Sequence, residues 1–219
     1  MLSWALLAFM TVNAALGFSE SAVPQDTEVS ARSEKIARAI ADLRGLHGAG
    51  DGVTQINTNV IVPQEQRLLD IAGQSEDARA EVVKALIDLL RSCASGGVSG
   101  GELGADYSLW VAACDALGEL KATEAIDLLV EHLVDGRGME SILMPYPVPP
   151  ALVKVGAEVI PKLTEAALKP AASARYRGWA VVVLGEIGGR RAMKALSRMQ
   201  RTETDPDVLG SINKLLLQR

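Results

Sequence analysis

The sequence is short of the residues that most catalytic and metal sites use. Its 219 residues include only two histidines and two cysteines, and aromatic residues make up 4% of the chain. The histidines, His47 and His132, lie far apart, and no Cys-x-x-Cys, Walker, Gly-x-Ser-x-Gly or His-Glu-x-x-His motif occurs. A Ser-x-x-Lys match at Ser211 to Lys214 has no companion motif. We therefore expect no enzyme, no cofactor and no metal site.

Long apolar runs are also missing, apart from one at the N-terminus. Residues 1–12 are mostly apolar and small residues follow, but this run is too short to span a membrane. The pattern is typical of a signal peptide over residues 1–17, although no Lys or Arg precedes the apolar run. We therefore predict an exported protein, periplasmic or secreted. The alternative is a buried N-terminal helix in a cytoplasmic protein.

A repeating pattern of apolar residues organises the rest of the chain. Four leucines recur 35, 32 and 32 residues apart: Leu117, Leu152, Leu184 and Leu216. A second apolar pair follows each of the first three: Ile126 and Leu129, Ile160 and Leu163, Met193 and Leu196. Each unit is therefore predicted to be a helix, a tight turn with glycine and a second helix. Because such a pair cannot bury its apolar face alone, the units must stack on one another.

One of these units resembles a known repeat family. The run from Arg177 through Ala180 to Leu184-Gly185-Glu186-Ile187-Gly188 is similar to the first helix of the short HEAT-like repeats of the PBS-lyase type. The segment Asp77 to Leu86 resembles the opening of such a unit. The resemblance covers roughly residues 63–219 and implies an all-α solenoid of helix-turn-helix repeats. It says almost nothing about function, so a lyase-like enzyme is implied by family analogy only.

We expect residues 18–32 to form a linker and residues 33–219 to form one solenoid domain. Ser33 suits the N-cap of a first helix. The repeat pattern then breaks, because residues 45–52 hold four glycines and strand-like alternation follows up to Pro63. A short irregular or extended insert is predicted near residues 45–62. The helices expected near 64–72 and 76–92 form one hairpin, which we favour, or else the second begins a unit of its own.

Two further segments each allow two interpretations. Cys93 and Cys114 flank a glycine-rich loop, and each extends the apolar stripe of its helix. They form a disulfide if the compartment is oxidising, or else they are two small core thiols. The Pro-rich run 145–150 is either a rigid connector whose Pro150 starts a helix or a polyproline ligand for a partner.

Charge is unevenly distributed along a chain whose formal net charge is −5. Residues 169–219 contain 10 Lys and Arg against 4 Asp and Glu, whereas the remainder contains 12 against 23. A basic surface on the last repeats is predicted from seven cations: Arg175, Arg177, Arg190, Arg191, Lys194, Arg198 and Arg201. Such a surface favours an anionic ligand or an acidic partner, and an exported location argues against nucleic acid.

Together these features predict a non-enzymatic interaction scaffold that binds a protein partner through its repeats. The alternative is a binder of an anionic ligand or nucleic acid through the basic residues of 175–201. The helix after Asp205 is half a repeat. Its open apolar side predicts association with a second copy of the chain.

Overall fold

The computed structural model describes residues 25–45, 58–95, 103–134 and 146–218. All regular structure in these ranges is helical. The α-helices are α1 (Gln25–Gly45), α2 (Thr58–Ala72), α3 (Glu76–Ser95), α4 (Leu103–Glu119), α5 (Ile126–Glu131), α6 (Val148–Val155), α7 (Ile160–Ala167), α8 (Ala174–Ile187), α9 (Gly189–Gln200) and α10 (Pro206–Leu217). Two short 3-10 helices, η1 (Thr123–Ala125) and η2 (Ala157–Val159), lead into α5 and α7.

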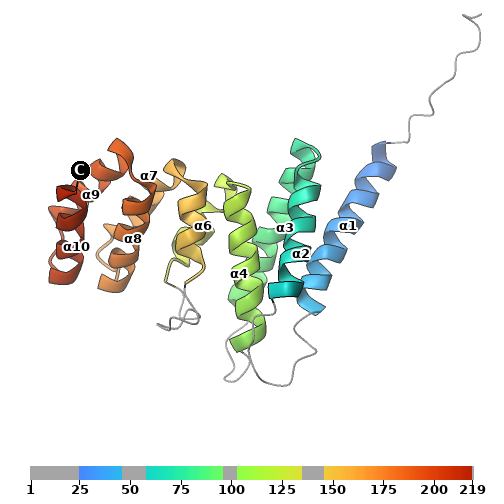
Figure 1. Cartoon of the computed structure of the whole chain (residues 1–219), viewed down its shortest axis with the longest axis horizontal. Helices are drawn as coiled ribbons and strands as arrows, with labels where there is room; N and C mark the ends of the chain where they lie inside the picture. Colours follow the sequence, from blue (N-terminus) through green and yellow to red (C-terminus); the bar gives the residue numbers. More distant parts are fainter. Residues whose placement is uncertain (1–24, 46–57, 96–102, 135–145, 219) are drawn as a thin grey trace, which may run out of the picture.

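The helices stack as hairpins in two rows (Figure 1). One row consists of the first helices of the hairpins, with α2 next to α4, then α6, α8 and α10. The second helices, α3, α5, α7 and α9, form the other row, and α3 meets the next unit through η1. The helix α1 packs against both α2 and α3 at one end, and α10 closes the opposite end. The predicted α-solenoid is confirmed.

The repeated leucines form the core of this stack. Leu117, Leu152 and Leu184 from the first helices are all 0% exposed. Leu129, Leu163 and Leu196 from the second helices are equally buried. Complete burial of one leucine side chain contributes about 1.5–3 kcal/mol. The spacing that defined the repeat therefore marks the positions that stabilise it, because each unit buries its leucines against its neighbours.

Glycines serve two different purposes in the repeats. Gly156 and Gly188 adopt φ angles of 90° and 65°, which are strained for other residues, and they allow the tight turn after the first helix. Lys121 occupies the equivalent turn of the preceding unit with φ 47°. Gly118 and Gly185, by contrast, lie inside the helices α4 and α8. A Cβ added at Gly118 would lie 3.0 Å from the backbone of α6, and one added at Gly185 would lie 2.8 Å from a leucine side chain of α10. These two glycines therefore let neighbouring first helices approach closely.

The N-terminal part differs from the sequence-based prediction at two helix starts. The helix α1 begins at Gln25, so residues 25–32 of the predicted linker are helical. The helix α2 begins at Thr58 and includes Pro63, so residues 58–62 of the predicted extended insert are helical as well. Local β-branched composition is a weak signal that packing overrides, and α2 packs on α1, α3 and α4. The predicted hairpin of α2 and α3 is confirmed.

Several other sequence-based predictions concern segments that the described residues cover only in part. Residues 1–17, most of the insert and most of the glycine-rich loop lie outside the described residues. In the Pro-rich run, α6 already begins at Val148 and the Tyr146 side chain is buried. This part of the run is therefore packed structure and not an exposed polyproline ligand. Where the structure describes the chain, every helix is too short or too polar to cross a membrane.

Candidate functional site

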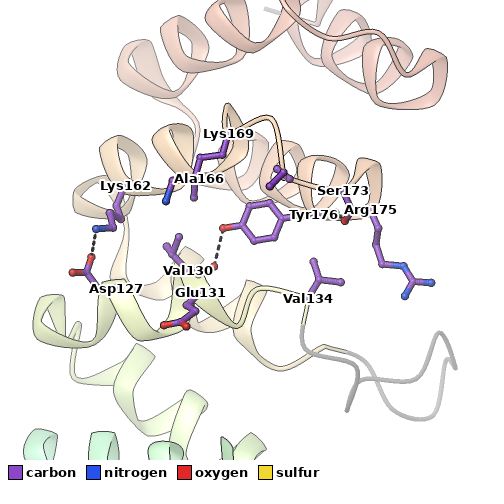
Figure 2. Close-up of a pocket in the computed structure, with 12 residues that line it drawn as sticks. Asp127, Val130, Glu131, Val134, Lys162, Ala166, Lys169, Ser173, Arg175 and Tyr176 are labelled. Carbon is purple, nitrogen blue, oxygen red and sulfur yellow. Dashed lines mark hydrogen bonds and ion pairs between the residues drawn. The ribbon is translucent and has the colours of Figure 1, made fainter.

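A cleft of about 780 Å³ lies between the second helices of two consecutive repeats, α5 and α7, and the beginning of α8 (Figure 2). Six of its twelve lining residues are exposed, so it is a wide groove that opens to solvent. The lining residues are Asp127, Val130, Glu131, Val134, Lys162, Ala166, Lys169, Ala171, Ala172, Ser173, Arg175 and Tyr176.

The Tyr176 ring lies in the middle of the cleft, between the two repeats (Figure 2). Its hydroxyl donates a hydrogen bond of 2.7 Å to the backbone carbonyl of Val130 on α5. Burial raises the pKa of Tyr176 to about 12. The phenol therefore remains protonated at ordinary pH, and its hydrogen bond joins α8 to α5.

Charged side chains surround the cleft on both helices. At one end Lys162 on α7 forms an ion pair of 2.9 Å with Asp127 on α5 (Figure 2). Glu131 lies on the α5 side and Lys169 follows the end of α7. At the other end the Arg175 guanidinium donates a hydrogen bond of 3.5 Å to the Tyr146 hydroxyl. The cleft thus combines an aliphatic interior with charges of both signs.

The turn between α7 and α8 holds this cleft in shape. Ser173 is the N-cap of α8, and its hydroxyl accepts a hydrogen bond of 3.1 Å from the backbone N–H of Tyr176. Arg177 donates a 2.7 Å bond to the backbone carbonyl of Ala172 and binds Glu203 at 2.7 and 2.8 Å. The Glu203 side chain is only 2% exposed, and the hydrogen bonds from Arg177 lower its pKa. Arg177 therefore fastens the turn to the segment before α10.

The seven predicted basic residues do not form one surface. Five of them share the solvent side of α9 and the residue that follows it: Arg190, Arg191, Lys194, Arg198 and Arg201. The opposite side of α9 is buried, and the helix contains no acidic residue. Arg191 lies 3.7 Å from Glu158. Arg175 lines the cleft instead, and Arg177 is bound to Glu203, so the predicted cluster is corrected to an α9 basic face of five residues.

A second polar cluster connects the first helices of three repeats. Lys154 on α6 donates a hydrogen bond to Asp115 on α4, and its Nζ lies 2.7 Å from a carboxylate oxygen of Glu119. Burial, together with a hydrogen bond to Asp115 and its charge, raises the pKa of Glu65 on α2 to about 8. Within the described ranges no group of three or more His, Cys, Asp or Glu is arranged to hold a metal ion. We interpret this cluster as a polar link between α2, α4 and α6.

The two cysteines lie in the core of adjacent helices. Cys93 on α3 is 5% exposed and Cys114 on α4 is 0% exposed, and α3 packs against α4. The structure shows both as buried side chains on neighbouring helices. The disulfide stays a prediction.

Sequence reasoning missed most of the cleft residues. A signal was present, because Asp127 and Glu131 are four residues apart and therefore lie on one face of α5. Lys162 lies on α7, and Lys169 follows the end of that helix. The pairs become a site only when α5 and α7 stack, which no spacing within one helix shows.

The fold is that of a HEAT-like helical repeat protein. The family model of the PBS lyase HEAT-like repeat matches residues 111–135. This stretch forms the second half of α4, η1 and α5, and it supplies the α5 side of the cleft. No curated protein and no solved structure matches the chain. The word lyase in the family's description does not assign an activity to this chain.

Proposed function

We propose that the protein is a non-catalytic scaffold that binds a protein partner outside the cytoplasm. The observation that carries this proposal is the open cleft between the repeats of α5 and α7, with six exposed lining residues. Stacked repeats provide a continuous wall, and exposed side chains on that wall are where solenoid proteins bind their partners. The raised pKa of Tyr176 supports a binding role, because a phenol with a pKa of about 12 is a poor general base.

The wall is held in one shape before a partner binds. Ion pairs join successive units on the second-helix side: Arg79 with Glu124 at 3.0 Å and Lys162 with Asp127 at 2.9 Å. Each such exposed pair contributes about 0–1 kcal/mol. The buried leucines supply most of the stability, and the ion pairs fix the orientation of the units. A preformed surface binds more tightly because less freedom is lost on binding.

Photo-cross-linking in the native host tests the scaffold function. A photoreactive residue is placed at Glu131 in the cleft, at Arg198 on α9 or at Lys84, which is exposed on α3. A discrete adduct with another protein at one or more positions is expected. The absence of a protein adduct at all three positions would overturn the scaffold proposal.

Export is supported by the apolar run and the small residues of residues 1–17. Intact-mass measurement of the protein from its native host tests this part separately. We expect a mass that lacks the N-terminal segment up to Ala14 or Gly17. A full-length mass would contradict export and leave the scaffold function standing.

The α9 basic face supports a second candidate function, the binding of an anionic ligand. Five exposed cations and no acidic residue on α9 produce a positive field that attracts phosphates. Inorganic polyphosphate serves as the probe. We expect polyphosphate binding to weaken steeply as salt is added and to be lost in the double variant Lys194→Glu, Arg198→Glu. Lys84→Glu is the matched control and should bind as the wild type does. Unchanged binding by the double variant would exclude the α9 basic face as the polyphosphate site.

A further inference from the structure

We propose that α10 is a dimerisation helix, which packs antiparallel against α10 of a second copy of the chain across a two-fold axis. This inference goes beyond the scaffold function proposed above and does not depend on it. Three features support it: an open stacking surface on α10, a contrast with the opposite end of the stack, and a symmetric pair of opposite charges.

The side of α10 that faces away from α8 repeats the surface through which α8 itself stacks on α10. A Cβ added at Gly178 or Gly185 of α8 would lie within 4 Å of a side chain of α10. The residues one repeat later, 32 positions along the chain, are Gly210 and Leu217. A Cβ added at Gly210 would meet no described atom within 4 Å, and Leu217 is 85% exposed. The helix α10, outermost in its row, therefore has room for another helix on this side (Figure 1).

The two ends of the stack differ in polarity. The outermost helix at the other end, α1, exposes charged side chains along its length, among them Glu34, Lys35, Arg38 and Asp42. Terminal units of repeat proteins need such a polar outer surface, because no further unit covers it. The open side of α10 instead carries Leu217, and an apolar side chain is stabilised when it leaves water. A partner on this side therefore buries surface that α1 does not offer.

Two opposite charges on the exposed side of α10 identify a second copy as the occupant. Asp207 and Lys214 are the charged residues of this helix, and both are exposed. Neither side chain forms an ion pair among the described residues. They lie symmetrically about Gly210 and Ser211, three residues to either side. In an antiparallel pair of α10 helices, Asp207 of each copy therefore lies beside Lys214 of the other, whereas a parallel pair would bring like charges together.

Small residues between these charges allow the two helices to approach each other. Gly210 and Ser211 lie in the middle of α10, and both are exposed. The distance between packed helices depends on the side chains at their contact, and Gly185 allows the same close approach of α8 to α10. At each end of the contact, Leu217 of one copy lies near the beginning of α10 of the other, where Pro206 is exposed.

The resulting contact is isologous, because both copies use the same surface and the two-fold axis closes the assembly. The dimer carries two α5–α7 clefts and two α9 basic faces. A partner with two binding segments is therefore held more tightly by the dimer than by one copy, since the second segment binds at a high effective concentration.

Sedimentation equilibrium of the intact protein over a range of concentrations tests the inference. One pair of helices forms a small interface, so we expect a dimer with a dissociation constant of roughly 1–100 μM. Leu217→Asp places a charge in the contact, and Gly210→Trp fills the centre of α10. Each should raise the dissociation constant at least tenfold. Lys84→Glu, a charge reversal on the exposed side of α3, is the control and should leave it unchanged.

Two charge reversals make the test specific for the antiparallel arrangement. Asp207→Lys leaves two cations on the open side of α10, and Lys214→Asp leaves two anions, so each variant alone should dimerise at least tenfold more weakly than the wild type. An equal mixture of the two variants should form a heterodimer about as tight as the wild-type dimer, because both opposite pairs are restored. This rescue does not occur if a variant has merely lost its fold.

Three outcomes would overturn the inference and leave the scaffold function standing. The first is a monomer throughout the concentration range. The second is a dimer whose dissociation constant does not change in Leu217→Asp or in either charge reversal. The third is a mixture of the two charge-reversed variants that dimerises no better than each variant alone. Thermal unfolding at a concentration where the wild type is monomeric checks that each variant is folded.

Discussion

Gly156 offers the sharpest test of the turn between the two helices of a repeat. It follows α6 with φ 90° and ψ −145°, a backbone conformation that residues with a side chain rarely adopt. A Cβ added at this position would meet no atom within 4 Å. Alanine therefore introduces backbone strain without a clash. We expect Gly156→Ala to lower the free energy of unfolding by about 1–3 kcal/mol.

Gly210 provides the matched control for the same substitution. It lies inside α10, and an added Cβ would again meet no atom within 4 Å. In a helix interior alanine is more favourable than glycine by about 0.8–1.0 kcal/mol. Gly210→Ala is therefore expected to raise the free energy of unfolding. The two variants add the same methyl group in open space and should change stability in opposite directions.

Equilibrium unfolding in urea, followed by far-UV circular dichroism, measures both effects. The two variants should differ by roughly 2–4 kcal/mol, the sum of the two expected effects. Each kcal/mol corresponds to about 2–4 °C in Tm for a chain of this size. If Gly156→Ala is as stable as the wild type, the positive φ angle assigned to Gly156 after α6 is wrong. If both variants lose stability equally, backbone conformation is not the cause.

Three further measurements test other parts of the structure. Glu203→Gln weakens the pair with Arg177 and should lower the free energy of unfolding by roughly 2 kcal/mol near neutral pH. Because that pairing lowers the pKa of Glu203, this loss should disappear as pH falls through the folded-state pKa. A loss of stability that persists in acid would contradict the pairing. The pKa of Glu65 is shifted in the opposite direction, from 4.5 to about 8. The stability that protonated Glu65 contributes is therefore complete below pH 4.5 and is lost as pH rises to about 8. Glu65→Gln should flatten this decline in urea unfolding, and an identical pH profile would refute the assignment. In protein from an oxidising compartment, denatured Cys93 and Cys114 should resist alkylation until reductant is added, whereas two alkylated thiols without reductant would rule out the disulfide.

The repeat architecture was predictable because its signal is local and periodic. Leu117, Leu152 and Leu184 recur at intervals of one repeat, and the structure buries all three completely. The helix starts at Gln25 and Thr58 were missed, because those segments have no apolar periodicity strong enough to outweigh polar or β-branched composition. There the contacts of α1 and α2 with their neighbours decide the structure.

The basic residues show a different limit of the sequence. Arg175 and Arg177 are two residues apart, yet one lines the cleft and the other binds Glu203, 26 residues further along the chain. Their charge was evident from the sequence. Their surroundings depend on which segment packs over the beginning of α8, and composition does not contain that information.

The sequence by itself determined that this protein is a stack of short helical hairpins, since helix periodicity and buried leucines are properties of neighbouring residues. Only the tertiary structure decided where the candidate binding cleft lies. Asp127, Lys162 and Tyr176 come from three different helices. They meet in one cleft because successive units stack at a defined angle, and that angle depends on close approaches such as those at Gly118 and Gly185. A surface made by stacking is a property of pairs of units, which no single repeat encodes.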